Sequence, residues 1–441
     1  MLHFMYILLV LMLISGFFIG KRDPFSPTVV FCTSFVFCCS WAVVFSKQWN
    51  LVLHTNTFNV ITCGVFTYII SALFARLFME KTKGKKVYLQ DIPSIEIQNW
   101  VILICILFEI FVILLSVFML RKITGFTNIS NAINAYDQSV KFSDKPYNYP
   151  MYVNLLRRAV GALGYWFAYV FVSYYISNKK IKIEYFFVFS LSFVSQLLSG
   201  GRNASINMVI GLCAYFAYFS QKKKKFYKYH IPIKTFFYII IILSVALLFF
   251  QRLGVIMGRD VVTVGINYIA GYCGAQIKNL DIFLQEPIPA SEIWGSQTFI
   301  NIINWVGPKV GILRKQYRLY LPFRRVNNIN LGNVATTFMS FYYDFGFIGV
   351  IILTMIMALF TQILYESIKR IKLKKIPSIS VIVYGYVFSS IVFSFFSNKF
   401  YEQNFTPTFF RYMLWWYFFN IIFGNINIRI KTKNIKIERQ K

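Results

Sequence analysis

Long apolar runs separated by short polar segments follow one another along most of the 441 residues. Runs near twenty residues are long enough to cross roughly 30 Å of hydrocarbon as an α-helix. The predicted spans are 2–20, 27–46, 58–79, 99–120, 152–177, 183–199, 203–220, 235–251, 334–365, 378–396 and 409–427. The pattern therefore predicts an all-α polytopic membrane protein with about 11 transmembrane helices, the first of which is a span and not a removed signal peptide.

Basic residues gather in every second loop between these spans. The basic segments are KRD at 21–23, EKTKGKK at 80–86, NKKIK at 178–182, QKKKKFYK at 221–228, KRIKLKK at 369–375 and the C-terminal tail. Because cytoplasmic loops carry an excess of Lys and Arg, this set is predicted to be cytoplasmic and the other loops exterior. The formal net charge of +30 is thereby explained largely without a nucleic-acid partner, which such a charge would suggest in a soluble chain.

Two exterior segments are longer than simple connections. Residues 121–150 read as a short amphipathic surface helix with a turn. Residues 252–333 form a large exterior loop, too long for a plain connector and too rich in aromatic residues for disorder. The predicted organisation is an N-terminal transmembrane bundle at 1–251, the large loop at 252–333, and C-terminal helices with a basic cytoplasmic tail at 334–441.

The large loop is basic on the side of the membrane where positive charge is normally scarce. Its basic residues are Arg252, Arg259, Lys278, Lys309, Arg314, Lys315, Arg318, Arg324 and Arg325, against Asp260, Asp281, Glu286 and Glu292. One interpretation is that long loops cross the membrane regardless of charge. The other is an anion site, for which arginine is suited because its planar fork binds phosphate oxygens through two hydrogen bonds.

The sequence SGGRN at 199–203 marks a sharp hinge between two apolar runs on the exterior side. Gly200 and Gly201 allow the reversal because they lack a Cβ atom, and Asn203 or Ser205 is a candidate helix cap. The first N–H groups of the new helix then lie beside Arg202, and a helix N-terminus itself attracts anions. The functional interpretation is a diphosphate cradle; the alternative is a tight hairpin whose arginine extends to the lipid headgroups.

Two carboxylates in apolar runs are further candidates. Glu109 lies in the middle of a span, where a carboxylate is costly and therefore a functional candidate, although a protonated or paired structural role is equally open. Asp344 lies in the outer half of a long span and could orient a substrate hydroxyl or pair with an exterior arginine. No histidine pair has metal-ligand spacing and no nucleotide-binding motif occurs, so we expect no metal and no cofactor. The energy for a reaction would then arrive with a substrate already in the membrane.

Three stretches resemble the O-antigen polymerase family, the oligosaccharide repeat unit polymerases of bacterial inner membranes. They are KRDPFSPTVVF near the start, LLSGGRNASI at the hinge and NVATTFMSFYYDFGFIGVIIL after the large loop. The hydropathy plan is similar over essentially the whole chain. The resemblance implies a GT-C-like glycosyltransferase with one large periplasmic loop. It would transfer a glycan from undecaprenyl diphosphate to the non-reducing end of another lipid-linked repeat unit, with its active site facing the periplasm.

The resemblance implies a role for Arg202, and the chemistry of the transfer suggests roles for other residues. Arg202 matches the hinge arginine of the family, and the exterior-loop residues Arg252, Arg259, Arg324 and Arg325 extend the predicted diphosphate site because fixed cations stabilise a departing diphosphate. Asp344 is the first candidate for a general base and Glu109 the second. The glycan-contacting candidates are Trp294, Trp305 and Tyr317, whose alternative role is anchoring at the membrane interface. The expected partners are the undecaprenyl-diphosphate-linked oligosaccharide, membrane lipids and a chain-length regulator protein.

Three other functions are compatible with parts of the pattern. An O-antigen ligase would share the large exterior loop and its arginines. A flippase for lipid-linked oligosaccharides would have basic residues inside its bundle and repeated halves, whereas the surplus charge here lies at the exterior edge. A scaffold without enzymatic activity would need no exterior basic cluster.

Overall fold

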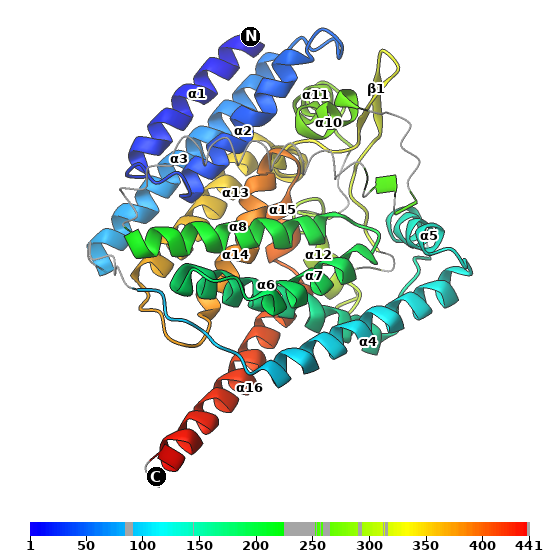
Figure 1. Ribbon diagram of the computed structural model, residues 1–441. Coiled ribbons are helices and arrows are strands. Elements are labelled where there is room, and N and C mark those ends of the chain that lie inside the picture. The colour runs from blue at the N-terminus through cyan, green and yellow to red at the C-terminus, as the bar shows by residue number, and fades with distance from the viewer. Residues whose placement is uncertain are drawn as a thin grey trace.

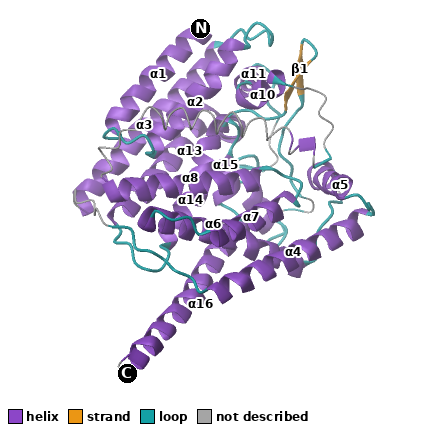
Figure 2. Cartoon of the chain, viewed as in Figure 1, coloured by secondary structure: helices purple, strands orange, loops and turns teal. Residues whose placement is uncertain are grey.

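The computed structural model describes residues 1–83, 91–143, 145–224, 252, 254–255, 257–258, 265–289, 293–311, 313 and 316–438, with side chains omitted at residues 224 and 425–438. The chain is mostly helical (Figure 1), and the strands of the described residues form one small hairpin (Figure 2). Six described helices are long and apolar enough to cross a membrane. They are α1 (Leu2–Ile19), α2 (Pro27–Val44), α3 (Thr55–Lys83), α4 (Asn99–Thr124), α6 (Met151–Asn178) and α13 (Thr337–Arg370). The prediction of an all-α multi-pass membrane protein is confirmed at this level.

The remaining predicted spans correspond to other helices wherever the structure describes them. They are α7 (Ile183–Leu197), α8 (Asn203–Lys224), α14 (Ile379–Val392) with the 3-10 turn η1 (Phe393–Phe395), and α16 (Pro407–Glu438). The predicted span 235–251 lies outside the described residues. The total of about 11 spans therefore stays a prediction.

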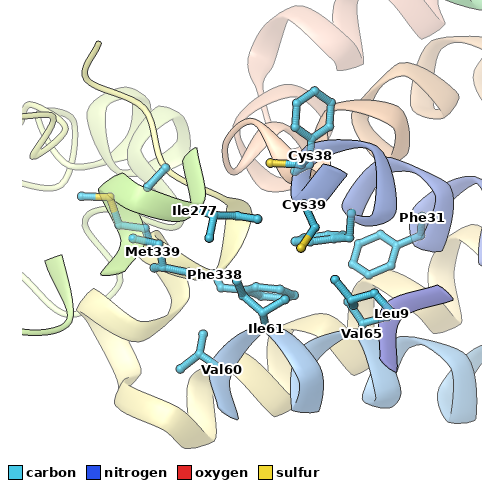
Figure 3. Packing of buried hydrophobic residues seen from close by; sticks show 14 of the residues in the cluster. Leu9, Phe31, Cys38, Cys39, Val60, Ile61, Val65, Ile277, Phe338 and Met339 are labelled. Carbon is cyan, nitrogen blue, oxygen red and sulfur yellow. The ribbon is translucent and has the colours of Figure 1, made fainter. Parts of the chain in front are cut away.

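The helices α1, α2, α3 and α13 share one apolar core. Phe31 of α2 stacks on Tyr68 of α3 with ring centroids 3.9 Å apart, and Phe35 stacks on Phe338 of α13. Gly64 allows α3 to pack closely against α13, because a Cβ atom at position 64 would lie 2.4 Å from the Phe338 ring. Figure 3 shows part of this core, with Phe31 and Phe338 labelled. The core brings the first spans against a helix that follows the large loop.

A second core joins α6, α7, α8, α14 and α16. Trp166 and Trp416 are fully buried in it, and the Trp416 indole donates to the Ala162 carbonyl oxygen at 2.9 Å. The C-terminal helices thus pack into the N-terminal bundle: α13 and α14 contribute to both cores, and α16 contributes to the second. Both cores therefore contain described residues of the predicted segments 1–251 and 334–441.

The loops group at two ends of the helices. At one end the α1–α2 loop meets the ends of α3, α8 and α13: Lys21 pairs with Glu80 at 2.6 Å, and Asp23 accepts hydrogen bonds from Gln221 and Tyr365. These are the basic segments predicted to be cytoplasmic. At the other end, the start of α3 contacts the large loop, where Thr57 donates to Asp281 at 2.7 Å. The grouping follows the predicted alternation of loops, while the side that each group faces stays a prediction.

The large loop contains regular structure. Its described elements are α10 (Ile266–Cys273), α11 (Ala275–Phe283), α12 (Ile300–Val306) and the antiparallel strands β1 (Arg324–Val326) and β2 (Ile329–Gly332). The short helix predicted within 121–150 is α5 (Ile129–Phe142), and α15 (Lys399–Asn404) precedes α16. Elements α5, α10, α11 and β1 lie toward the right of Figure 1, at the end that carries the candidate site.

Candidate functional site

The hinge between α7 and α8 turns at a glycine that tolerates no other side chain. Gly200 has φ +79°, in the region that favours glycine, and a Cβ atom there would come within 2.5 Å of the Asp137 Cβ atom on α5. Asp137 also pairs with Lys141 at 2.6 Å. The amphipathic surface helix α5 therefore packs directly under the hinge and fixes where α8 begins.

Arg202 immediately precedes α8, and its carbonyl oxygen accepts the Ile206 N–H as the first turn of the helix forms. The side chain is only 4% exposed. The guanidinium donates to the hydroxyl oxygens of Tyr268 and Tyr272 on α10, both at 3.1 Å, and its carbon lies 5.5 Å from the Tyr272 ring centroid. These contacts fix the plane of the guanidinium.

The phenol of Tyr268 is held in its neutral form, and its oxygen accepts from Arg202 through a lone pair. Burial raises its pKa, and the neighbouring Tyr272 raises it further, against the opposing effect of Arg202.

The start of α8 is held in a different way from the predicted cap. The Ser205 hydroxyl donates to the Phe193 carbonyl oxygen of α7 at 3.0 Å, which ties the two helices together across the hinge.

A first cleft lies beyond Tyr272. The Tyr272 ring is stacked on Phe396, with centroids 6.1 Å apart, and the next residues of the chain, Ser397 and Asn398, line the cleft. We call it the Tyr320 cleft; its lining is Gln297, Leu319, Tyr320, Leu321, Ala335, Thr336, Met339, Ser340, Tyr343, Ser397, Asn398 and Glu402. Its volume of about 20 Å³ suits a small polar group, since one water needs roughly 10–15 Å³.

Three buried polar atoms of the Tyr320 cleft have no hydrogen-bond partner among the described residues. They are Thr336 Oγ1, Ser397 Oγ and Asn398 Oδ1. Buried polar groups in proteins are nearly always hydrogen-bonded, so three such atoms around one cleft mark it as suited to a polar ligand group. A sugar hydroxyl is of the right size and hydrogen-bonding character.

A second cleft adjoins the first. We call it the Arg411 cleft; it is lined by Arg158, Asn301, Trp305, Tyr386, Glu402, Gln403, Thr406, Pro407, Thr408 and Arg411. Its volume of about 530 Å³ lies in the range of small-molecule sites. Glu402 lines both clefts, and its carboxylate pairs with Lys399 at 2.7 Å. This carboxylate is therefore shared by a small polar cleft and a larger basic one.

Asp344 holds backbone rather than facing a cleft. Its carboxylate accepts from the backbone N–H of Thr298 at 2.6 Å and from that of Gln297 at 3.1 Å. Two residues later α13 kinks at Gly346, where φ is 62° and ψ −157°. These bonds give Asp344 the geometry of a structural anchor for residues 297–298, of which Gln297 lines the Tyr320 cleft. Its role as a general base stays a prediction.

Replacing Asp344 with alanine should lower stability. Two N–H groups would lose a charged acceptor, which costs about 1–3 kcal/mol for a buried group. Thermal unfolding of the purified protein in detergent should therefore begin at a lower temperature. A variant that unfolds like the wild type but has no activity would instead restore Asp344 as a candidate base.

Glu109 lies inside the bundle, away from both clefts. It is fully buried on α4, and the Ser192 hydroxyl of α7 donates to its Oε1 atom at 2.5 Å. Its Oε2 atom has no partner among the described residues. Glu109 is thus a contact between α4 and α7, and the structure does not bring it together with Arg202 or Asp344.

Among the predicted arginines of the large loop, Arg324 is engaged by a carboxylate away from Arg202. Arg324 binds both carboxylate oxygens of Glu286, at 2.7 and 2.6 Å, and these hydrogen bonds lower the pKa of Glu286. Arg325 and Arg252 are exposed, and Arg259 lies outside the described residues. The guanidinium of Arg324 is therefore already engaged by a carboxylate.

The three predicted aromatic residues are in different surroundings. Trp305 lines the Arg411 cleft, with the Lys309 ammonium 4.4 Å from its ring centroid. Trp294 is 82% exposed and packs edge-on against Phe345. Tyr317 is half-buried, and its backbone is held by two hydrogen bonds with the Asn304 side chain. Only Trp305 lies at a cleft.

Sequence reasoning missed Glu402, Arg411 and the Tyr320 cleft. Glu402 and Arg411 lie in NKFYEQNFTPTFFR, the first in the segment between the last two predicted spans and the second near the start of the last one. A usable signal was present, because Thr-Pro is a typical start of a helix: the Thr406 hydroxyl accepts the Phe409 N–H at 3.1 Å, and Pro407 opens α16.

Comparison of the chain with models of protein families, with curated protein sequences and with solved structures finds no match. The function is therefore argued from the residues and their geometry.

Proposed function

We propose that this chain is a membrane glycosyltransferase of the polysaccharide-polymerase type. It would transfer a growing glycan from undecaprenyl diphosphate onto the non-reducing end of a second lipid-linked repeat unit, at the periplasmic face of a bacterial inner membrane. The observation that carries the proposal is the position of Glu402, shared by a cleft with unpartnered polar atoms and a cleft with two arginines. A carboxylate in this position can take the proton of an acceptor hydroxyl in one cleft while a donor glycan lies in the other.

In the proposed reaction, a sugar hydroxyl of the acceptor occupies the Tyr320 cleft. Its oxygen attacks the anomeric carbon of the donor glycan while the bond from that carbon to the diphosphate oxygen breaks. The hydroxyl proton passes to Glu402, and the electron pair of the broken bond leaves with undecaprenyl diphosphate. A positioned carboxylate accelerates such a proton transfer by about 10²–10⁴-fold.

Positive charge stabilises the departing diphosphate. Arg202 lies at the start of α8 and is held in plane by Tyr268 and Tyr272, so it is preorganised for an anion. Through Tyr272 and Phe396 it is linked to the wall of the Tyr320 cleft. Fixed cations of this kind contribute to catalysis because they need no reorganisation when charge develops.

The direct test uses the purified protein and lipid-linked repeat units. The expected product is a ladder of oligomers on undecaprenyl diphosphate, separated by gel electrophoresis. A strain lacking the protein should make surface glycan capped with a single repeat unit. Accumulation of finished polymer on undecaprenyl diphosphate would instead indicate a ligase, and repeat units retained at the cytoplasmic face would indicate a flippase.

A further inference from the structure

The Arg411 cleft brings together two arginines from helices far apart in sequence. Arg158 comes from the third turn of α6 and Arg411 from the second turn of α16; both are half-buried. Among the described residues, neither guanidinium forms an ion pair, and the one carboxylate in the cleft, Glu402, pairs with Lys399. Two guanidinium groups lining one cleft repel each other, and an anion between them would relieve the repulsion.

The start of α16 adds to this positive potential. Thr406, Pro407 and Thr408 form one wall of the cleft at the N-terminus of a 32-residue helix. The N–H groups in the first turn of a helix favour an anion. Here the Thr406 hydroxyl accepts the Phe409 N–H and donates to the Gln403 carbonyl oxygen, so the donors that this wall offers are the backbone N–H and the hydroxyl of Thr408. The two arginine forks and Thr408 are together suited to the several oxygens of a diphosphate.

The surroundings of Arg411 favour an anion attached to a lipid. Phe410 is 49% exposed and Leu414 is 69% exposed, so apolar side chains project from α16 on either side of the arginine along the helix. Met151, at the start of α6, is 84% exposed. An isoprenoid chain can lie along these side chains while its diphosphate enters the cleft, whereas a free phosphate would make no use of them.

We propose that the Arg411 cleft binds the diphosphate of a lipid-linked substrate and is a second diphosphate site, separate from Arg202. The inference rests on the proposed function, in which donor and acceptor each carry a diphosphate. Arg158 and Arg411 bind the diphosphate oxygens, and Trp305, which lines the same cleft, packs beside the first sugar. Because Glu402 lines both clefts, the glycan of the lipid bound here reaches the carboxylate directly.

The test measures binding rather than transfer. Purified protein in nanodiscs of neutral phosphatidylcholine is titrated with undecaprenyl diphosphate, and two equivalents should bind. Arg158→Gln/Arg411→Gln should bind one. The single variant Arg411→Gln, which perturbs the fold less, should weaken one of the two sites by at least about tenfold, the effect of losing a charged hydrogen bond. Thermal unfolding of each variant verifies that it is folded.

Arg157→Gln is the matched control. Arg157 neighbours Arg158 but stacks on the Tyr149 ring at 4.4 Å and does not line the cleft, so this variant should still bind two equivalents. Two equivalents bound by folded Arg158→Gln/Arg411→Gln would overturn the inference. Equal competition by phosphatidylglycerol or by inorganic pyrophosphate would also overturn it, in favour of a general headgroup or free-anion site. Wild-type protein that binds two equivalents without forming polymer would refute the proposed function alone.

Discussion

Replacing Arg202 with alanine should abolish long-chain polysaccharide while the protein is still made and inserted. The guanidinium is buried and donates to two tyrosines, so alanine removes both the cation and the link between α8 and α10. Loss of one preorganised charge-stabilising group lowers turnover by about 10²–10³-fold in other enzymes. The measurement is the glycan ladder of cells carrying the variant, with the protein level determined by immunoblot.

Two further variants separate charge from geometry at the hinge. Lys47→Ala removes an exposed positive charge from a loop at the same end of the helices, and polymer should form as in the wild type. Arg202→Lys keeps the charge but replaces the planar fork, which bonds two phenols at once, by a single ammonium group. Shorter or scarcer polymer is expected from it. An unchanged length distribution would refute a role for the guanidinium geometry.

The helices could be predicted from sequence because the signals for each one lie within or directly beside its own segment. Apolar runs near twenty residues long and basic segments at alternate loops locate α1 to α4, α6 and α13 to within a few residues. The hinge could also be predicted, since Gly200 and Gly201 mark a reversal whatever the rest of the chain does. In both cases the signal lies within the segment itself.

The clefts depend on contacts between distant segments, which a single sequence does not reveal. Arg158 and Arg411 are more than 250 residues apart, and nothing local indicates that they line one cleft. The partner of Arg324 also depends on a contact between distant segments. The excess of basic residues in the large loop predicted a shared anion site, but Arg324, on β1, pairs with Glu286.

Asp344 and Glu402 illustrate how burial and partners decide the role of a carboxylate. The sequence predicts Asp344 as a candidate base because it is an acidic residue in the outer half of an apolar run. In the structure, two backbone N–H groups donate to its carboxylate. Glu402 lies in the short helix α15, where a carboxylate is not unusual and the sequence gives no reason to single it out. Its importance comes from the two clefts that meet at it, a property of the tertiary structure alone.

Replacing Glu402 with glutamine should eliminate turnover without preventing substrate binding. Glutamine keeps the shape of the side chain and its contact with both clefts but cannot take a proton from the acceptor hydroxyl. We expect the transfer rate to fall by about 10²–10⁴-fold, the usual contribution of a general base. Single-turnover transfer between lipid-linked repeat units measures the rate, and titration with undecaprenyl diphosphate should still give two equivalents.

Two control variants distinguish a base from a positioning group. Glu286→Gln makes the same chemical change at an exposed carboxylate that binds Arg324, and it should leave the transfer rate unaltered. Lys399→Gln keeps the Glu402 carboxylate and removes its ion-pair partner, so it should lower the transfer rate without abolishing transfer. A wild-type rate in Glu402→Gln would mean that departure of the diphosphate activates the donor without a base, and that the arginines carry the catalysis.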